Sequence, residues 1–251
     1  MTQSTRALAL CLILAACSGG GEPELAEGAA AREYFPLVKD AHWVYLVDYG
    51  GMRKGELEVF GRGLRSVNGL EGEAFINDEV IPQAEAIGFE PVAPVAYMTV
   101  DGYLGQVSGL DYDEKGGVRV IAGEDPKRLL PLEPQQGATW EESPRILELP
   151  QGGGGGVTRW RRSIAARDSL DVPAGTFRDV LVVESQYWDD DVSSEKPLMR
   201  YEDYYARGVG LLRTVTFDEQ NGGRQIMEQS LLRYAFPEPG SEPETPAKPA
   251  S

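Results

Sequence analysis

The chain has 251 residues, of which 41% are hydrophobic, and its formal net charge is −16. This acidity excludes nucleic-acid binding, which needs basic contacts to phosphates, and it argues against a peripheral electrostatic grip on anionic lipid headgroups. Both cysteines, Cys11 and Cys17, lie near the start, and His42 is the single histidine, so we expect neither a metal site nor a cofactor in the rest of the chain.

Residues 1–16 predict a signal peptide. Arg6 precedes an apolar run at residues 7–16, which has the length of a signal-peptide core and is too short to span a bilayer. The stretch 14–17 (LAAC) resembles the lipobox of bacterial lipoproteins. The resemblance implies that Cys17 is the site of lipid attachment and the first residue of the mature protein. An ordinary secretory signal with an incidental cysteine is the alternative.

The residue after Cys17 bears on location. In proteobacterial lipoproteins an aspartate at this position usually retains the protein in the inner membrane, so by this resemblance Ser18 favours the outer membrane. We therefore expect an extracytoplasmic protein that is held on its membrane by acyl chains. The sequence leaves open whether it faces the periplasm or the outside.

The two ends of the mature chain have compositions unsuited to a packed core. Residues 17–33 are rich in Gly, Ala and Glu and predict the acylated cysteine followed by a flexible tether. Residues 237–251 are rich in Pro and Glu and predict a disordered tail, and the glycine run 152–156 predicts a surface loop. The folded domain is expected between residues 34 and 236.

Within that domain, short segments rich in Val, Tyr, Phe, Trp and Thr alternate with turn residues. The expected strands cover residues 42–48, 56–60, 73–81, 95–100, 118–122, 157–164, 177–187, 200–206, 210–217 and 224–234. No long helical periodicity follows residue 34. The pattern predicts an all-β or β-dominated α+β domain, built as an antiparallel curved sheet, a sandwich or a partly open barrel.

A weak internal repeat suggests two similar halves. The segment 35–37 (FPL) precedes Trp43, and the segment 130–132 (LPL) precedes Trp140 at a comparable spacing. Each unit predicts an extended Pro-Leu entry, a turn and a strand that begins with Trp. The halves would span residues 34–125 and 128–236, with chance similarity as the alternative.

Three segments together resemble a known group of proteins. They are 34–45 (YFPL…WVY), 172–177 (VPAGTF) and 204–211 (YYARGVGL). The combination resembles a family of uncharacterised, membrane-anchored bacterial lipoproteins with a β-rich extracytoplasmic domain. The resemblance implies architecture and offers no catalytic residues to transfer. This chain has Asp40 and Ala41 where such openings usually carry Gly, so its first turn can differ.

No catalytic or metal site is predicted from the motifs. His42 lies at the start of an expected strand, where a structural role is expected, and no serine occupies a Gly-x-Ser-x-Gly elbow. The loop at Asp111 begins like a calcium-binding EF-hand, but Lys115 and Ala122 occupy ligand positions, so it is interpreted as a hairpin turn. The acidic run 189–191 is interpreted as a solvated turn.

One local basic cluster is a weak candidate for ligand binding. The cluster comprises residues 159–162 (RWRR), and Arg159, Trp160 and Arg161 are its named candidates: they could hold an anionic ligand, with the indole as a stacking face. The alternative is that these residues are alternating positions of an exposed strand.

Three functions remain open from the sequence. A curved antiparallel sheet can carry an apolar small molecule in a cleft lined by Trp, Tyr and Leu. An envelope structural or interaction protein would instead have a filled core and bind another envelope protein. A hydrolase, the least favoured, would need convergent carboxylates of raised pKa. The expected partners are the membrane, through the lipid, and one such molecule or protein, with the oligomeric state left open.

Overall fold

The computed structural model describes residues 29–50, 54–81, 92–121, 125–144, 158–189 and 195–238. The signal peptide, Cys17, the glycine run 152–156 and most of the C-terminal tail lie outside the described residues, so the predictions made for them stay predictions.

One sheet of 14 strands makes up almost all of the described chain. The strands from the first half of the sequence are β1 (His42–Asp48), β2 (Lys54–Asn68), β3 (Glu73–Val80), β4 (Val92–Val100), β5 (Tyr103–Val107), β6 (Leu110–Tyr112) and β7 (Val118–Val120). Those from the second half are β8 (Lys127–Pro131), β9 (Thr139–Glu142), β10 (Thr158–Val172), β11 (Gly175–Asp189), β12 (Met199–Ala206), β13 (Gly210–Asp218) and β14 (Arg224–Ala235).

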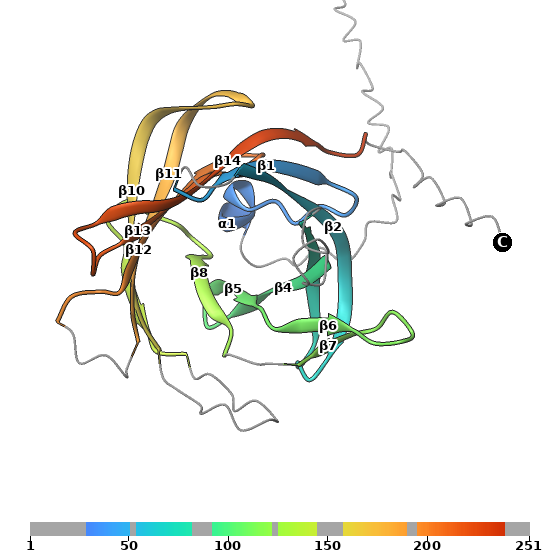
Figure 1. Cartoon of the computed structure of the whole chain (residues 1–251). Coiled ribbons are helices and arrows are strands. Elements are labelled where there is room, and N and C mark those ends of the chain that lie inside the picture. Colours follow the sequence, from blue (N-terminus) through green and yellow to red (C-terminus); the bar gives the residue numbers. More distant parts are fainter. Residues whose placement is uncertain are drawn as a thin grey trace, which may run out of the picture.

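The sheet curls into a nearly closed barrel (Figure 1). Its strand order is β8-β5-β4-β3-β2-β1-β14-β13-β12-β11-β10-β9, and neighbours along this path are antiparallel. The small hairpin β6–β7 lies off the path and joins β2 through a parallel pairing of β7. The expected all-β fold with an antiparallel, barrel-like sheet is therefore confirmed.

A short helix, α1 (Ala29–Tyr34), lies against the inside of the ring of strands (Figure 1). The Ala31 amide donates to the carbonyl of Leu132 at 3.0 Å, and the Gly208 amide donates to the carbonyl of Glu33 at 2.6 Å. Phe35, just after the helix, packs on the ring of Tyr97. Residues 29–33 were expected to belong to the tether; they form this helix instead because the apolar face of the segment is buried in the barrel.

The core has three parts. The inner cluster surrounds α1 and holds residues from strands on both sides of the barrel. A second cluster forms where the long β10–β11 hairpin packs across β12, β13 and β14, and a third lies under β6–β7 on the outer face of β3 and β4. Val180, Leu181, Val182 and Val183 are all buried, so this part of β11 is covered on both faces of the sheet.

The turn of the β10–β11 hairpin explains the VPAGTF segment. Gly175 has a φ of 138°, a region that favours glycine. The Ala174 amide donates to the carbonyl of Leu231 at 3.0 Å, and Phe177 contacts the ring of Tyr234. The hairpin tip is thereby fastened onto β14.

Side chains, rather than a strand ladder, close the barrel between its end strands β8 and β9. The amide of Arg128 donates to Oε2 of Glu142 at 2.8 Å. The carbonyl of Arg128 accepts from Nε1 of Trp140 and from the guanidinium of Arg162, each at 3.0 Å. Arg162 also ion-pairs with Glu142, and both side chains are less than a tenth exposed. We call this set of four residues the seam.

Candidate functional site

The strand alternation directs a distinct set of side chains into the barrel. On β3, Phe75, Asn77 and Glu79 share one face, because successive residues of a strand point to opposite sides. Phe75 lies opposite Tyr97 on β4, and Glu79 lies opposite Val59 on β2. The registers of β1 to β4 therefore gather polar and aromatic side chains on one inner wall.

These residues form a pocket of about 80 Å³ between the wall and the segment that follows α1. We call it the inner pocket. Its lining comprises four aromatic side chains, three polar ones and four others: Phe35, Trp43, Tyr45 and Tyr97; Asn77, Glu79 and Gln229; and Pro36, Val59, Gly210 and Leu211.

Gly210 allows the strand β13 to approach the entry segment. Its φ is +100°, and a Cβ there would lie 3.2 Å from Cδ of Pro36. A larger residue would therefore be strained in its backbone and crowd the pocket wall. The close approach therefore explains why the YYARGVGL segment has glycine at position 210.

The hydrogen-bond donors of Trp43 and Tyr45 are engaged by backbone carbonyls. Nε1 of Trp43 donates to the carbonyl of Val209 at 2.8 Å, and the hydroxyl of Tyr45 donates to the carbonyl of Leu211 at 3.2 Å. These bonds fix both rings against the start of β13. The rings contribute apolar surface to the pocket and no free donor.

Asn77 supplies an unpaired acceptor. Its side chain is only 5% exposed, and its Oδ1 has no hydrogen-bond partner within the described parts of the chain. Its amide interacts with the hydroxyl of Tyr97, as does that of Gln106. An unpaired buried polar atom is costly, so it indicates a bound water, ion or ligand as its partner.

Glu79 gives the inner pocket an ionisable group of unusual character. Burial alone raises its pKa above the ordinary carboxyl value. Burial and the proximity of Glu79 raise the pKa of Tyr45 and of Tyr97, so both phenols stay neutral at physiological pH. Glu79 is thus the one carboxyl among the residues that line the pocket, and none of those residues is basic.

A second carboxyl, half-buried like that of Glu79, lies on β12. Burial raises the pKa of Asp203 to about 6, against the opposing effects of a hydrogen bond from Thr214 and of the Arg162 charge. The Thr214 hydroxyl donates to Asp203 at 2.7 Å. Tyr205 interacts electrostatically with Asp203 and with Tyr97, so this carboxyl shares the barrel interior with the aromatic wall.

The structure separates the three residues of the predicted basic cluster. Trp160 packs on Tyr187 and Tyr201, with ring centroids 4.8 and 5.6 Å away. Arg159 and Arg161 lie on the opposite face of β10, where both guanidinium groups stack over Trp188. The three residues therefore do not form one binding surface.

Arg162, outside the three-residue candidate, is the arginine that joins Trp160. Its guanidinium lies 4.7 Å from the Trp160 ring, on the side of the strand that also faces the seam. Arg161 instead pairs with Glu141 at the surface, with Nε 2.6 Å from Oε1. A two-residue strand period would have paired position 160 with 162 and position 159 with 161.

A larger hollow of about 510 Å³ lies beside the seam. Its acidic side chains include Asp101, Glu141 and Glu142, and each is paired with an arginine: Arg128, Arg161 and Arg162, respectively. Because these charges are compensated internally, the hollow is a weaker candidate than the inner pocket.

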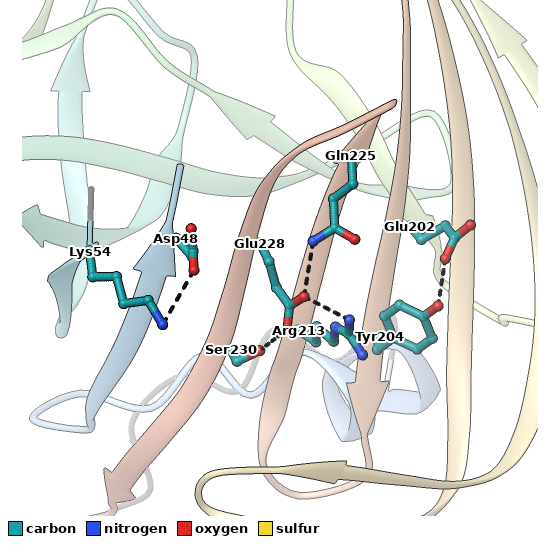
Figure 2. A network of polar contacts seen from close by, with 8 residues as sticks. All are labelled: Asp48, Lys54, Glu202, Tyr204, Arg213, Gln225, Glu228 and Ser230. Atoms are coloured by element: carbon teal, nitrogen blue, oxygen red, sulfur yellow. Dashed lines mark hydrogen bonds and ion pairs between the residues drawn. The ribbon is translucent and has the colours of Figure 1, made fainter. Parts of the chain in front are cut away.

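The outer face of β12 to β14 carries a polar network (Figure 2). Glu228 accepts hydrogen bonds from Arg213, Gln225 and Ser230 at 2.8–3.1 Å, and Tyr204 donates to Glu202 at 2.6 Å. Because these bonds join neighbouring strands, we assign the network to strand register and stability, although Nε of Arg213 has no partner among the described residues.

His42, considered for catalysis, and the loop at Asp111, considered for calcium binding, have structural roles. Nε2 of His42 lies 2.8 Å from Oε2 of Glu58, and its ring stacks on Phe60. Asp113 accepts from the amides of Lys115 and Gly117, which makes a hairpin turn of the loop that resembled an EF-hand. In the described ranges no group of three or more His, Cys, Asp or Glu side chains could hold a metal ion.

No helix in the described part of the chain is long and apolar enough to cross a membrane. No family model matches the sequence. No curated protein matches it either.

Two solved structures are similar to the chain. A candidate lipoprotein from Parabacteroides distasonis ATCC 8503 has 12% sequence identity and a TM-score of 0.50, over 81% of this chain and 99% of that one. A candidate exported protein with a YmcC-like fold, from Bacteroides fragilis NCTC 9343, has 10% identity and a TM-score of 0.41, over 80% and 98% of the two chains. At this identity the first likeness shows the shared fold and nothing further.

Proposed function

We propose that the protein is an envelope lipoprotein, anchored through acylated Cys17, whose barrel is a non-enzymatic binding module. The lipobox-like residues 14–17 support the anchor, and the similar Parabacteroides protein is described as a candidate lipoprotein. Binding is supported chiefly by the unpaired, buried Oδ1 of Asn77 beside Glu79 in the inner pocket.

The pocket size restricts the ligand. Sites for drug-sized molecules occupy roughly 300–1,000 Å³, whereas the inner pocket has about 80 Å³. It can hold a very small molecule or the head group of a larger one. If the ligand is larger, its apolar part would lie outside the pocket. The apolar ligand expected from the sequence would therefore enter the pocket only through its head group.

An envelope scaffold is the second candidate. The inner cluster and α1 fill much of the barrel, as a protein that works through its outer surface would require. Under this alternative the inner pocket holds only water, and Asn77 is bonded to that water.

Native mass spectrometry of the full chain, extracted in detergent from bacterial membranes, tests both parts of the proposal. We expect a covalent mass that lacks residues 1–16 and includes acyl chains, together with a small non-covalent adduct. A Cys17→Ser variant should lose the acyl mass only. An Asn77→Leu variant, similar in shape, should lose the adduct only.

The two parts can fail separately. An unlipidated chain that keeps residues 1–16 would contradict the anchor. A lipidated chain without any adduct, in the wild type as in Asn77→Leu, would favour the scaffold.

A further inference from the structure

We infer that the inner pocket recognises an organic cation, namely the ammonium group of a small alkylamine or of an amine head group. This inference rests on the proposed ligand binding and names the ligand's chemistry. It follows from three properties of the pocket: the buried Oδ1 of Asn77 is an acceptor without a partner among the described residues, the lining has one carboxyl and no basic side chain, and the walls are aromatic.

The free acceptors favour a ligand that donates hydrogen bonds. The donors of Trp43 and Tyr45 are already bonded to backbone carbonyls. Oδ1 of Asn77 accepts nothing from the described residues. A ligand that offers N–H groups would satisfy this oxygen, whereas a phosphate or carboxylate would place further acceptors against it.

The charge of Glu79 lacks a counterion in the described part of the chain. Burial is the sole cause of its raised pKa, with no opposing basic side chain. Arg162, a buried arginine of the described chain, is already paired with Glu142 at the seam. A buried carboxylate without a partner is costly, and a bound cation would compensate its charge.

The aromatic lining suits the same ligand. The rings of Phe35, Trp43, Tyr45 and Tyr97 all line the pocket. Aromatic rings attract ammonium ions within about 6 Å through their quadrupole, most strongly where water is excluded. Charge, hydrogen bonding and ring surface therefore select one class of ligand.

Three probes of similar size separate these contributions. Propylammonium carries both a charge and N–H donors, tetramethylammonium carries the charge alone, and 1-propanol carries a donor without charge. Binding to residues 17–251, expressed with Cys17→Ser, is followed by NMR through the indole N–H of Trp43. We expect propylammonium to bind at least about tenfold more tightly than 1-propanol, with tetramethylammonium in between.

A Glu79→Gln variant should lose the preference for the cations and keep the affinity for 1-propanol. Glu73→Gln is the matched control, because Glu73 lies exposed on the same strand, and it should leave all three affinities unchanged. Binding of propylammonium should also weaken as the pH falls and Glu79 becomes protonated. The neighbouring phenols of Tyr45 and Tyr97 do not titrate in that range, because their pKa values are raised.

The outcomes distinguish this inference from the proposed function. Equal affinity for propylammonium and 1-propanol would contradict the preference for a cation, while the pocket would remain a binding site. Cation binding that survives Glu79→Gln would overturn the assignment to this pocket. If no probe binds at millimolar concentration, the inference that the pocket recognises a cation is wrong. The native mass spectra would then decide whether the barrel binds any ligand.

Discussion

At the scale of single residues, two inward-facing carboxyls carry most of the chemical interest. Glu79 and Asp203 both have raised pKa values because burial disfavours their charged forms. Asp203 accepts a hydrogen bond from Thr214, whereas Glu79 faces the pocket. A strand at residues 73–81 was expected from the sequence, but the roles of Asn77 and Glu79 were missed. Their strand also carries Asp78, and the sequence could not show which face is inward.

Asp203 gives a prediction for stability against pH. The folded protein holds this proton up to a pKa of about 6, whereas the unfolded chain releases it near the ordinary value of 3.8. The free energy of unfolding should therefore fall as pH rises between these values. Asp203→Asn should be more stable than the wild type above about pH 6, by up to about 3 kcal/mol, and equal to it below about pH 4.

Denaturant unfolding at several pH values measures this effect. Asp218→Asn is the matched control, because hydrogen bonds from Asn221 lower the pKa of that exposed carboxyl. Its substitution should act in the opposite direction and reduce stability at neutral pH. If the difference in unfolding free energy between Asp203→Asn and the wild type does not vary with pH, this carboxyl is not desolvated.

At the scale of elements, the list of expected strands located ten and missed β5, β6 and β8, whereas β9 was predicted only by the repeat, as the strand at Trp140. The missed strands are only three to five residues long, and Gly105 and Pro131 further weaken their local pattern. The hairpin β10–β11 is longer than expected, because residues 165–169 (AARDS) have low strand propensity and depend on their β11 partners for strand structure. Short strands that pair with residues distant in the sequence have no recognisable local sequence pattern.

The seam makes a prediction of its own. Glu142→Gln would leave the guanidinium of Arg162 buried without its counterion, and removing one partner of a buried pair typically costs about 3–5 kcal/mol. Glu141→Gln is the adjacent control: its pair with Arg161 is more than half exposed, so its loss should cost less than about 1 kcal/mol. Denaturant unfolding of the two variants compares them. Equal, small losses would show that the seam contributes little to closure.

At the scale of the whole molecule, the two runs of strands meet at β1 and β14 and face each other across the seam. Trp43 and Trp140, the residues that suggested a repeat, are both buried, and each indole donates to a carbonyl of the other run, at Val209 and Arg128. The division into two similar halves stays a prediction. The all-β barrel could be predicted because turn residues and β-branched segments alternate throughout. The pocket could not, because it depends on registers between strands far apart in sequence.

The most direct test of the central claim is electron density in the inner pocket. A crystal structure of the mature Cys17→Ser chain, purified from a bacterial periplasm without unfolding, should show a non-water molecule within hydrogen-bond distance of Asn77 Oδ1 and Glu79. Ordered water alone at both groups, in protein whose native mass also shows no adduct, would contradict a binding role and leave the scaffold as the better account.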